Sequence, residues 1–347
     1  MADADRPVVE RVQVSTAYGS GPEGGNSAWV LPESGVVVDP GPPGDEAFEH
    51  LRSELAAVGL AVGDVVDVVV THWHVDHAGL APRLADAADA TLHLHERDAK
   101  LVGEYAAERE RRVARDAAAL ARWGVPDEHV DRLRDADSPS PMPDAFPVSE
   151  LRDGDRVGAL RVVHAPGHTA GHVGFAVADD PGSAGGGEGR VLTGDAVLRT
   201  VTPNVGGGDT RQEEPLSAYR DALTDLVAAG DRALPGHGTA FDLQDRVAEL
   251  REHHRERATL VHDSLAALVG DVEGGVTPWR VARDRFGEMD GYHVKFGAGE
   301  AFAHLQDLVA LDLAVRVTDD PLRYRVAESV HDDRDVAGAL DAAWTGT

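Results

Sequence analysis

Valine-rich runs separated by glycine-rich turns dominate the start of the chain. Between residues 8 and 40 these runs are VVERVQVST, NSAWVL and GVVVDPG, a pattern typical of the short strands of a hairpin-rich sheet. Residues 45–58 instead repeat apolar side chains at helical spacing and are followed by Gly59, which predicts a helix. A second valine run at 64–70 returns to strand. This order of strand, helix and strand predicts a layered α/β domain.

The middle of the chain has a different composition. Residues 96–145 are heavily charged, rich in helix formers and end in a proline-rich loop, so they predict a helical insertion between strands. Strand and helix patterns then resume, with strands at 160–167, 172–179, 190–197 and 232–238 and a helix at 216–230. The glycine-rich connection 180–189 lacks the terminal Lys-Ser/Thr of a nucleotide-binding loop, so we assign it no phosphate-binding role.

The C-terminal part has a pattern of its own. A long charged helix is predicted near 243–269, followed by two helices, TPWRVARDRFG and AGEAFAHLQDLVALDL, and a hairpin, AVRVTDDPLRYRVAE. Two helices and a hairpin predict a small winged-helix module of about 75 residues. At roughly 150 residues per domain, the chain's 347 residues correspond to about 2.3 domains. We therefore predict one domain over residues 1–242 and a second over 243–347.

The charge of the chain limits its partners. The net charge is −28, and only Lys100 and Lys295 are lysines among 33 basic residues. So acidic a surface repels polyanions and argues against large phosphate-tracking footprints. The two explanations of this composition are adaptation to high salt and a GC-rich genome. The absence of a long apolar run and of a secretory pattern predicts a cytoplasmic protein with no membrane partner.

The strongest chemical signal directly follows the predicted strand at 64–70. His72, His74, Asp76 and His77 lie within six positions, and four such side chains are costly to bury unless something compensates them. A divalent metal ion, or two, would do so. Because the chain has no cysteine, any metal must bind to His, Asp and Glu. A strand cannot aim all four side chains at one ion, so this spacing favours a dinuclear site.

Three more candidate ligands each follow a predicted strand and lie beside a glycine: His168, Asp195 and His237. The glycines let the backbone turn sharply and approach the centre closely. The set predicts one ion on His72, His74 and His168. A second ion is predicted on Asp76, His77 and His237, with Asp195 as a carboxylate bridge between the two.

The combined motifs HxHxDH, GHT, GD and GHG, in this order, resemble those of the metallo-β-lactamase superfamily of hydrolases over residues 8–240. The resemblance implies an αββα sandwich. Zinc β-lactamases of the commonest kinds use a cysteine ligand that this chain lacks, and the cysteine-free ones generally lack the aspartate at position 195. The motifs therefore argue against penicillin hydrolysis and resemble those of glyoxalase II and ribonuclease Z. No flavodoxin-like domain follows, which argues against the diiron flavoprotein branch.

The C-terminal extension makes the chain similar to the β-lactamase-like protein 2 group, some of whose members cleave single-stranded RNA, and to glyoxalase-II-like proteins. In that group the insertion, here 96–145, overhangs the metal site. Its arginines, Arg111, Arg112 and Arg115, would then meet an anionic substrate; the alternative is a solvated helix face with i,i+4 charge pairs. The predicted second helix of the winged-helix module has no Lys or Arg. We therefore expect the module to pack against the rest of the chain or to form a homodimer, rather than to bind DNA.

We therefore expect a metal-dependent hydrolase that uses a metal-bridging hydroxide, with Asp76 and Asp195 fixing that hydroxide. Two divalent ions are expected, zinc first, with iron and manganese as alternatives. The predicted substrate is a small thioester or ester. The alternatives are single-stranded RNA, acted on as by an endoribonuclease, and a metal-binding regulatory protein without catalysis.

Predicted substrate contacts are His172, Arg199 and Arg211. His172 has an alternative role in orienting a metal ligand. The other histidines are expected to be structural or surface residues: His93, His95, His164, His253, His254, His262, His304 and His331.

Overall fold

The computed structural model describes residues 6–14, 23–178, 189–269, 274–330 and 333–344. The chain divides into two compact units, each drawn from three stretches of sequence. The first unit comprises Met1–Arg109, Pro139–Pro203 and Asp221–Val247, and the second comprises Glu110–Ser138, Asn204–Arg220 and Ala248–Thr347. The predicted domains 1–242 and 243–347 stay a prediction. Most of the glycine-rich connection 180–189, and His331, lie outside the described residues.

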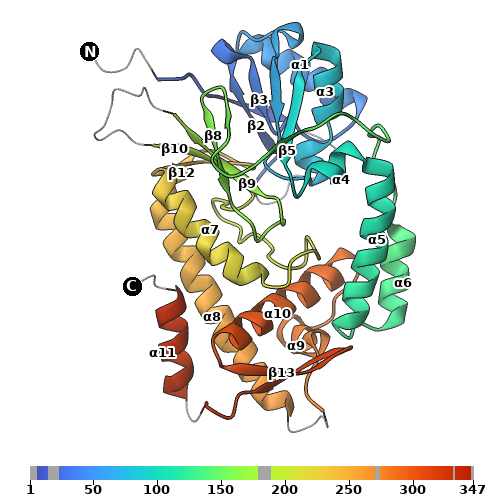
Figure 1. Cartoon of the computed structure of the whole chain (residues 1–347), viewed down its shortest axis with the longest axis vertical. Coiled ribbons are helices and arrows are strands. Elements are labelled where there is room, and N and C mark those ends of the chain that lie inside the picture. The colour runs from blue at the N-terminus through green and yellow to red at the C-terminus, as the bar shows by residue number, and fades with distance from the viewer. Residues whose placement is uncertain (1–5, 15–22, 179–188, 270–273, 331–332, 345–347) are drawn as a thin grey trace. The chain divides into compact units, whose positions relative to one another are not determined.

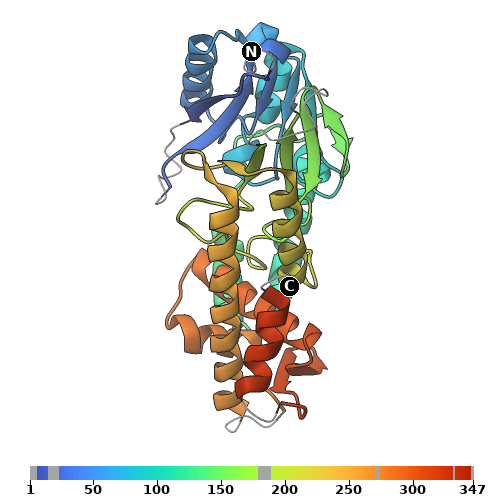
Figure 2. The same cartoon turned by 90° about the vertical axis from the view of Figure 1, so that its left-hand side faces the viewer.

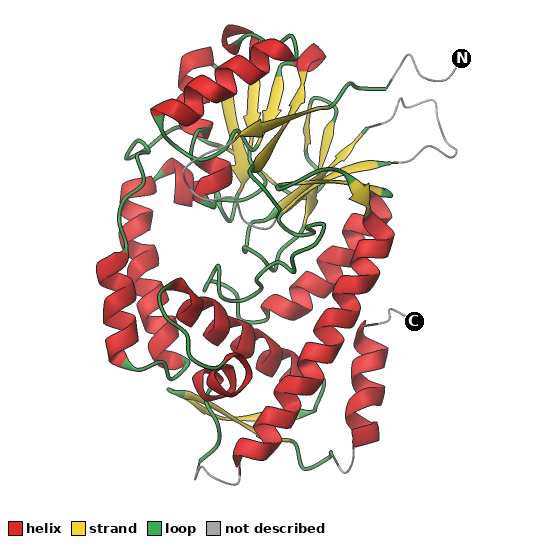
Figure 3. Cartoon of the chain, turned by 180° about the vertical axis from the view of Figure 1, so that it is seen from behind, coloured by secondary structure: helices red, strands yellow, loops and turns green. Residues whose placement is uncertain are grey.

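The first unit contains two six-stranded sheets that face each other, visible as two groups of strands in Figure 3. The first sheet has the order β1 (Glu10–Val14), β2 (Asn26–Leu31), β3 (Val36–Val38), β4 (Asp67–Val69), β5 (Thr91–His95), β6 (Ser149–Leu151). The second has the order β12 (Phe241–Asp242), β11 (Arg232–Pro235), β10 (Arg190–Gly194), β9 (Val173–Val177), β8 (Leu160–His164), β7 (Arg156–Val157). Strands β3 to β6 run parallel, as do β10 and β11, and the other pairs are antiparallel.

The valine runs are continuous because both faces of the first sheet are covered. Val37 and Val68 pack in the core shared with α1 (Asp45–Ala57) and α3 (Ala81–Ala88). Their neighbour Val69 points the other way, into the core between the two sheets. A strand buried on both faces needs apolar residues at every position rather than at alternate ones. The predicted helix at 45–58 and the predicted α/β sandwich are both confirmed.

The short helices of the first unit are α2 (Val75–Ala78) and α4 (Ala99–Gly103), with 3₁₀ turns at Pro32–Ser34 and Val62–Asp64. Three helices cross from one unit to the other: α5 (Tyr105–Arg122), α7 (Pro215–Ala229) and α8 (Leu243–Val269). Figure 1 marks these helices along the chain. Among the described residues, no helix has the length and apolar character required to cross a membrane.

The second unit is built mainly of helices, and those of its C-terminal stretch are shown in orange and red in Figure 2. Its further elements are α6 (Asp127–Ala136), α9 (Pro278–Phe286), α10 (Tyr292–Ala310), β13 (Ala314–Asp319), β14 (Leu322–Val326) and α11 (Asp333–Trp344). The predicted helical insertion and the order helix, helix, hairpin are present as secondary structure. The winged-helix assignment itself stays a prediction.

Helix α10 begins earlier than the sequence suggests, at Tyr292, and runs through Gly297 and Gly299. At Gly299 a Cβ would lie 2.4 Å from the Cα of Gly207, so this glycine permits close backbone packing rather than a turn. The longer helix includes Lys295, which corrects the expectation that it carries no cation. Lys295 is buried, so it is not placed as a phosphate contact on a recognition surface.

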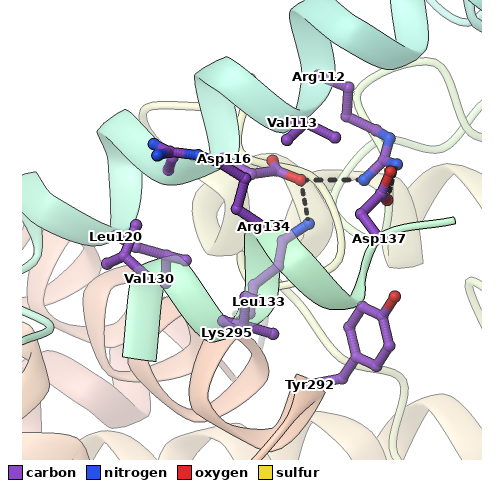
Figure 4. Close-up of a pocket in the computed structure, with 11 residues that line it drawn as sticks. Arg112, Val113, Asp116, Leu120, Val130, Leu133, Arg134, Asp137, Tyr292 and Lys295 are labelled. Atoms are coloured by element: carbon purple, nitrogen blue, oxygen red, sulfur yellow. Dashed lines mark hydrogen bonds and ion pairs between the residues drawn. The ribbon is translucent and has the colours of Figure 1, made fainter. Parts of the chain in front are cut away.

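A buried ion network joins the segments of the second unit (Figure 4). The Lys295 Nζ donates to Asp116 Oδ2 at 2.8 Å, and Arg112 donates to the same oxygen at 3.2 Å and to Asp137 at 2.7 Å. Thr210 donates to the other oxygen of Asp116 at 2.7 Å. Arg112 thus makes the i,i+4 pair of the solvated-face alternative, but in a largely buried position. The network fixes α5 against α10 and the segment around Thr210.

We expect Asp116→Ala to destabilise the second unit, because it leaves the buried cations Lys295 and Arg112 without a shared counter-charge. The expected loss in the free energy of unfolding is about 3–5 kcal/mol, measured by urea denaturation. The matched control is Asp131→Ala, which removes an exposed pair with Arg134 and should cost less than about 1 kcal/mol. Equal losses in the two variants would contradict this role for the network.

Candidate metal centre

The seven predicted ligands come together at the strand ends of the first unit. Their ligand atoms form three overlapping groups, in each of which all atoms lie within 4.8 Å of one another. The groups are His72, His74 and His168; His72, His77 and Asp195; and Asp76, His77 and His237. They follow β4, β8, β10 and β11, so strand ends from both sheets supply the cluster.

Hydrogen bonds on the outer side of two histidines fix where their protons lie. Thr71 Oγ1 donates to Asp39 Oδ2 at 2.7 Å and so accepts from Nδ1 of His72 at 3.0 Å. Nδ1 of His77 donates to the same carboxylate at 3.1 Å. A neutral imidazole carries one N–H, so Nε2 of His72 presents a lone pair to the cluster. Although burial opposes it, Asp195 and Asp76 raise the pKa of His77 well above its ordinary value, so its Nε2 must lose a proton to bind a metal ion, which leaves the same tautomer as in His72. This is the tautomer that a metal ligand needs.

Three ring nitrogens meet at the first group. Nδ1 of His74 lies 3.0 Å from Nε2 of His72 and 3.0 Å from Nε2 of His168. Burial and, after it, the neighbouring His168 lower the pKa of His74 to about 3. Burial also holds the pKa of His72 well below its ordinary value. The rings of His72 and His74 are therefore neutral near pH 7, the form in which imidazole binds a metal ion.

The second part of the cluster combines carboxylates with histidines. Nε2 of His77 lies 3.4 Å from Asp195 and 3.5 Å from Asp76, and Nε2 of His237 lies 3.5 Å and 3.4 Å from the same two carboxylates. Although burial opposes it, Asp195 raises the pKa of His237 to about 9. His77 Nε2 and Asp195 Oδ1 are buried with no hydrogen-bond partner among the described residues. Buried nitrogen and oxygen atoms without a hydrogen-bond partner in a polar cluster are suited to bind a divalent cation.

Asp39 is a functional residue that the sequence analysis missed. Its buried carboxylate accepts from Thr71 N at 2.7 Å, from Thr71 Oγ1 and from His77. It directly follows β3 and has a φ of 53°, which is uncommon outside glycine. The available signal was an aspartate between a buried valine strand and the Pro-Gly at 40–41.

The predicted substrate contacts have different surroundings. His172 is fully buried, and its Nε2 accepts from the backbone N–H of Asp195 at 3.1 Å, which favours the role of orienting a ligand. Arg199 is exposed and donates to Thr239 Oγ1 at 3.0 Å, close in sequence to His237. Arg211 belongs to the second unit and pairs with Asp209. Contact of any of them with a substrate stays a prediction.

Other histidines have structural surroundings, as expected. His95 stacks on His164 with ring centroids 4.2 Å apart, and His93 lies 2.7 Å from a carboxylate oxygen of Asp67. In the second unit, His254 and His304 are buried against each other. Their packing role is confirmed.

Comparison with known proteins matches this arrangement to one family. The sequence profile of the Metallo-beta-lactamase superfamily matches residues 20–237. The "Beta-lactamase-like protein 2 homolog" of Caenorhabditis elegans is 27% identical over 260 residues, covering 71% of this chain and 69% of that protein. The "Atrochrysone carboxyl ACP thioesterase" of Aspergillus fumigatus is 25% identical over 262 residues, covering 73% of this chain and 65% of the other.

A solved structure extends the likeness over almost the whole chain. The crystal structure of a metallo-beta-lactamase family protein from Thermus thermophilus is similar with a TM-score of 0.68 and 27% sequence identity. The match covers 92% of this chain and 98% of that one.

We expect Gly236→Ala to disrupt the cluster, because a Cβ there would lie 2.4 Å from Asp195 Oδ1 and 2.6 Å from the His77 ring. Bound metal per chain, measured by elemental analysis, should fall at least tenfold. The control is Gly63→Ala, where a Cβ meets nothing within 4 Å. Full metal content in Gly236→Ala, with circular dichroism like that of the control, would contradict the geometry.

Proposed function

The chain belongs to the metallo-beta-lactamase superfamily, whose members are metal-dependent hydrolases, and from this premise we propose that its seven-residue cluster binds two divalent ions and hydrolyses small thioesters or esters. One observation carries the proposal. The Nδ1–H groups of His72 and His77 are held on the outer side by Thr71 and Asp39, so the Nε2 atoms of both rings point into a buried space shared with carboxylates.

The three overlapping groups support the allocation of ligands. His72, His74 and His168 would hold the first ion, and Asp76, His77 and His237 the second. Asp195 would bridge them. When bound, two such ions lower the pKa of a water molecule toward ~7 and polarise the substrate oxygen. We propose zinc, while iron and manganese also accept this donor set of nitrogens and oxygens.

The residues in and around the cluster would have different roles in the reaction. Asp76 has the more accessible carboxylate, with about a third of its side chain exposed, against 11% for Asp195. Asp76 would therefore contact water or substrate, while the more buried Asp195 would bridge the two ions. His172 keeps Asp195 in place through its backbone N–H. Arg199, exposed and hydrogen-bonded to Thr239, would attract an anionic group of the substrate.

The substrate class rests on charge and on similarity. A net charge of −28 repels an RNA chain more strongly than a small monoanion. A thioesterase is among the similar proteins. Single-stranded RNA is the alternative that the resemblance to the β-lactamase-like protein 2 group suggests, and it is tested in parallel.

We expect the metallated protein to hydrolyse S-acyl thioesters and Asp195→Ala to lower kcat/KM by at least about 100-fold, since loss of a ligand exceeds the usual effect of its outer partners. Chelation should abolish the activity and added zinc restore it. Parallel assays use a fluorogenic single-stranded RNA at low and high KCl. Cleavage of RNA alone would contradict the thioester proposal, and no hydrolysis of either by protein with two bound ions would contradict the hydrolase proposal.

Arg199→Ala should raise KM for an anionic thioester by about 1.4- to fivefold and leave kcat unchanged, because an exposed charge contributes roughly 0.2–1 kcal/mol. Steady-state kinetics with an anionic and a neutral thioester of the same acyl group measure this effect. Arg52→Ala, an exposed arginine on α1 paired with Glu49, is the control. Equal changes for both substrates would contradict a role in charge recognition.

A further inference from the structure

We propose that Asp98 is a positioning residue for the first metal ion: its buried carboxylate joins the loop that carries His74 to the loop that carries His168. The inference rests on the proposed metal centre and assigns to it a residue outside the ligand set. Asp98 is fully buried at the start of α4, directly after β5.

The Asp98 carboxylate does not cap its own helix, α4. Aspartate is a preferred N-cap residue, and its side chain ordinarily accepts from backbone N–H groups two or three residues later. Asp98 occupies the N-cap of α4 but makes no side-chain cap hydrogen bond. A buried carboxylate is costly unless it is hydrogen-bonded, so its partners elsewhere explain why it is there.

Those partners lie on two loops from different sheets. Oδ2 accepts from the backbone N–H of Trp73 at 3.3 Å and from Thr169 Oγ1 at 2.8 Å. Oδ1 accepts from the backbone N–H of Gly171 at 3.0 Å. A Cβ at Gly171 would lie 2.5 Å from Oδ1, so the approach is as close as a glycine allows.

Two of the three partners are next to a histidine of the cluster. Trp73 lies between His72 and His74 on the loop after β4 of the first sheet. Thr169 follows His168 on the loop after β8 of the second sheet. One carboxylate therefore sets the distance between the two loops, and with it the 3.0 Å approach of His74 Nδ1 to His168 Nε2.

The second ion depends on a different carboxylate. His77 is held by Asp39, whose other hydrogen bonds go to Thr71 on the loop after β4. Loss of Asp98 should therefore weaken the first ion and spare the second. A residue needed only for general stability would weaken both ions together.

The experiment measures two zinc dissociation constants by competition with a chelator, on the full chain. His168→Ala and His237→Ala identify which constant belongs to which ion. Asp98→Ala should raise the constant of the first ion by about 10- to 100-fold and change that of the second by less than about threefold. Asp98→Asn, which keeps one acceptor oxygen, should give an intermediate value.

Two further variants keep the test decisive if Asp98→Ala does not fold. Thr169→Val removes only the hydroxyl that donates to Asp98 and should weaken the first ion by a smaller factor. Asp155→Ala removes a carboxylate that accepts from Arg152 N in the same unit, and it should leave both constants unchanged. The melting temperature of each metal-free variant is measured alongside.

Unchanged constants in Asp98→Ala or, if that variant does not fold, in Thr169→Val would overturn the inference. Equal weakening of both ions, in proportion to a lower melting temperature without metal, would overturn it as well. Failure of the proposed metal centre is a separate result, because the unmodified protein would then not bind two ions.

Discussion

The burial of many lone pairs at one point is the constraint on which the first unit depends. Imidazole nitrogens and carboxylate oxygens from four strand ends converge within a few ångströms. His77 Nε2 and Asp195 Oδ1 have no hydrogen-bond partner among the described residues. Leaving such groups buried and unpaired costs several kcal/mol, and a divalent cation removes that cost. Metal binding and the stability of the strand ends therefore depend on the same side chains.

The surrounding fold holds this cluster from outside. Valine strands buried on both faces keep the first sheet rigid, and its strand ends, with those of the second sheet, carry the ligands. Asp39 accepts hydrogen bonds from the loop after β4 and from α2, so it orients two imidazoles with one carboxylate. Gly236 lets the backbone approach Asp195 more closely than any side chain would allow.

Sequence reasoning was sufficient for features that local patterns encode. The period of apolar residues predicted α1 and the strands β1 to β4 and β8 to β11. The spacing of His72, His74, Asp76 and His77 pointed to a metal cluster, and the superfamily and the fold are confirmed. Asp39 was missed because its partners lie 32 and 38 residues away in the chain.

The remaining differences also come from long-range contacts. Asp98 reads locally as a helix cap, but its partners are 25 and 71 residues away. Gly299 lies inside α10 because the backbone of Gly207 approaches it closely, a contact that no local pattern encodes. The most direct test of the metal centre is anomalous X-ray diffraction at the zinc edge from crystals grown with zinc. Two peaks about 3.5–4 Å apart, ligated by the seven residues, are predicted; no peak in this cluster, or peaks bound elsewhere, would contradict the account.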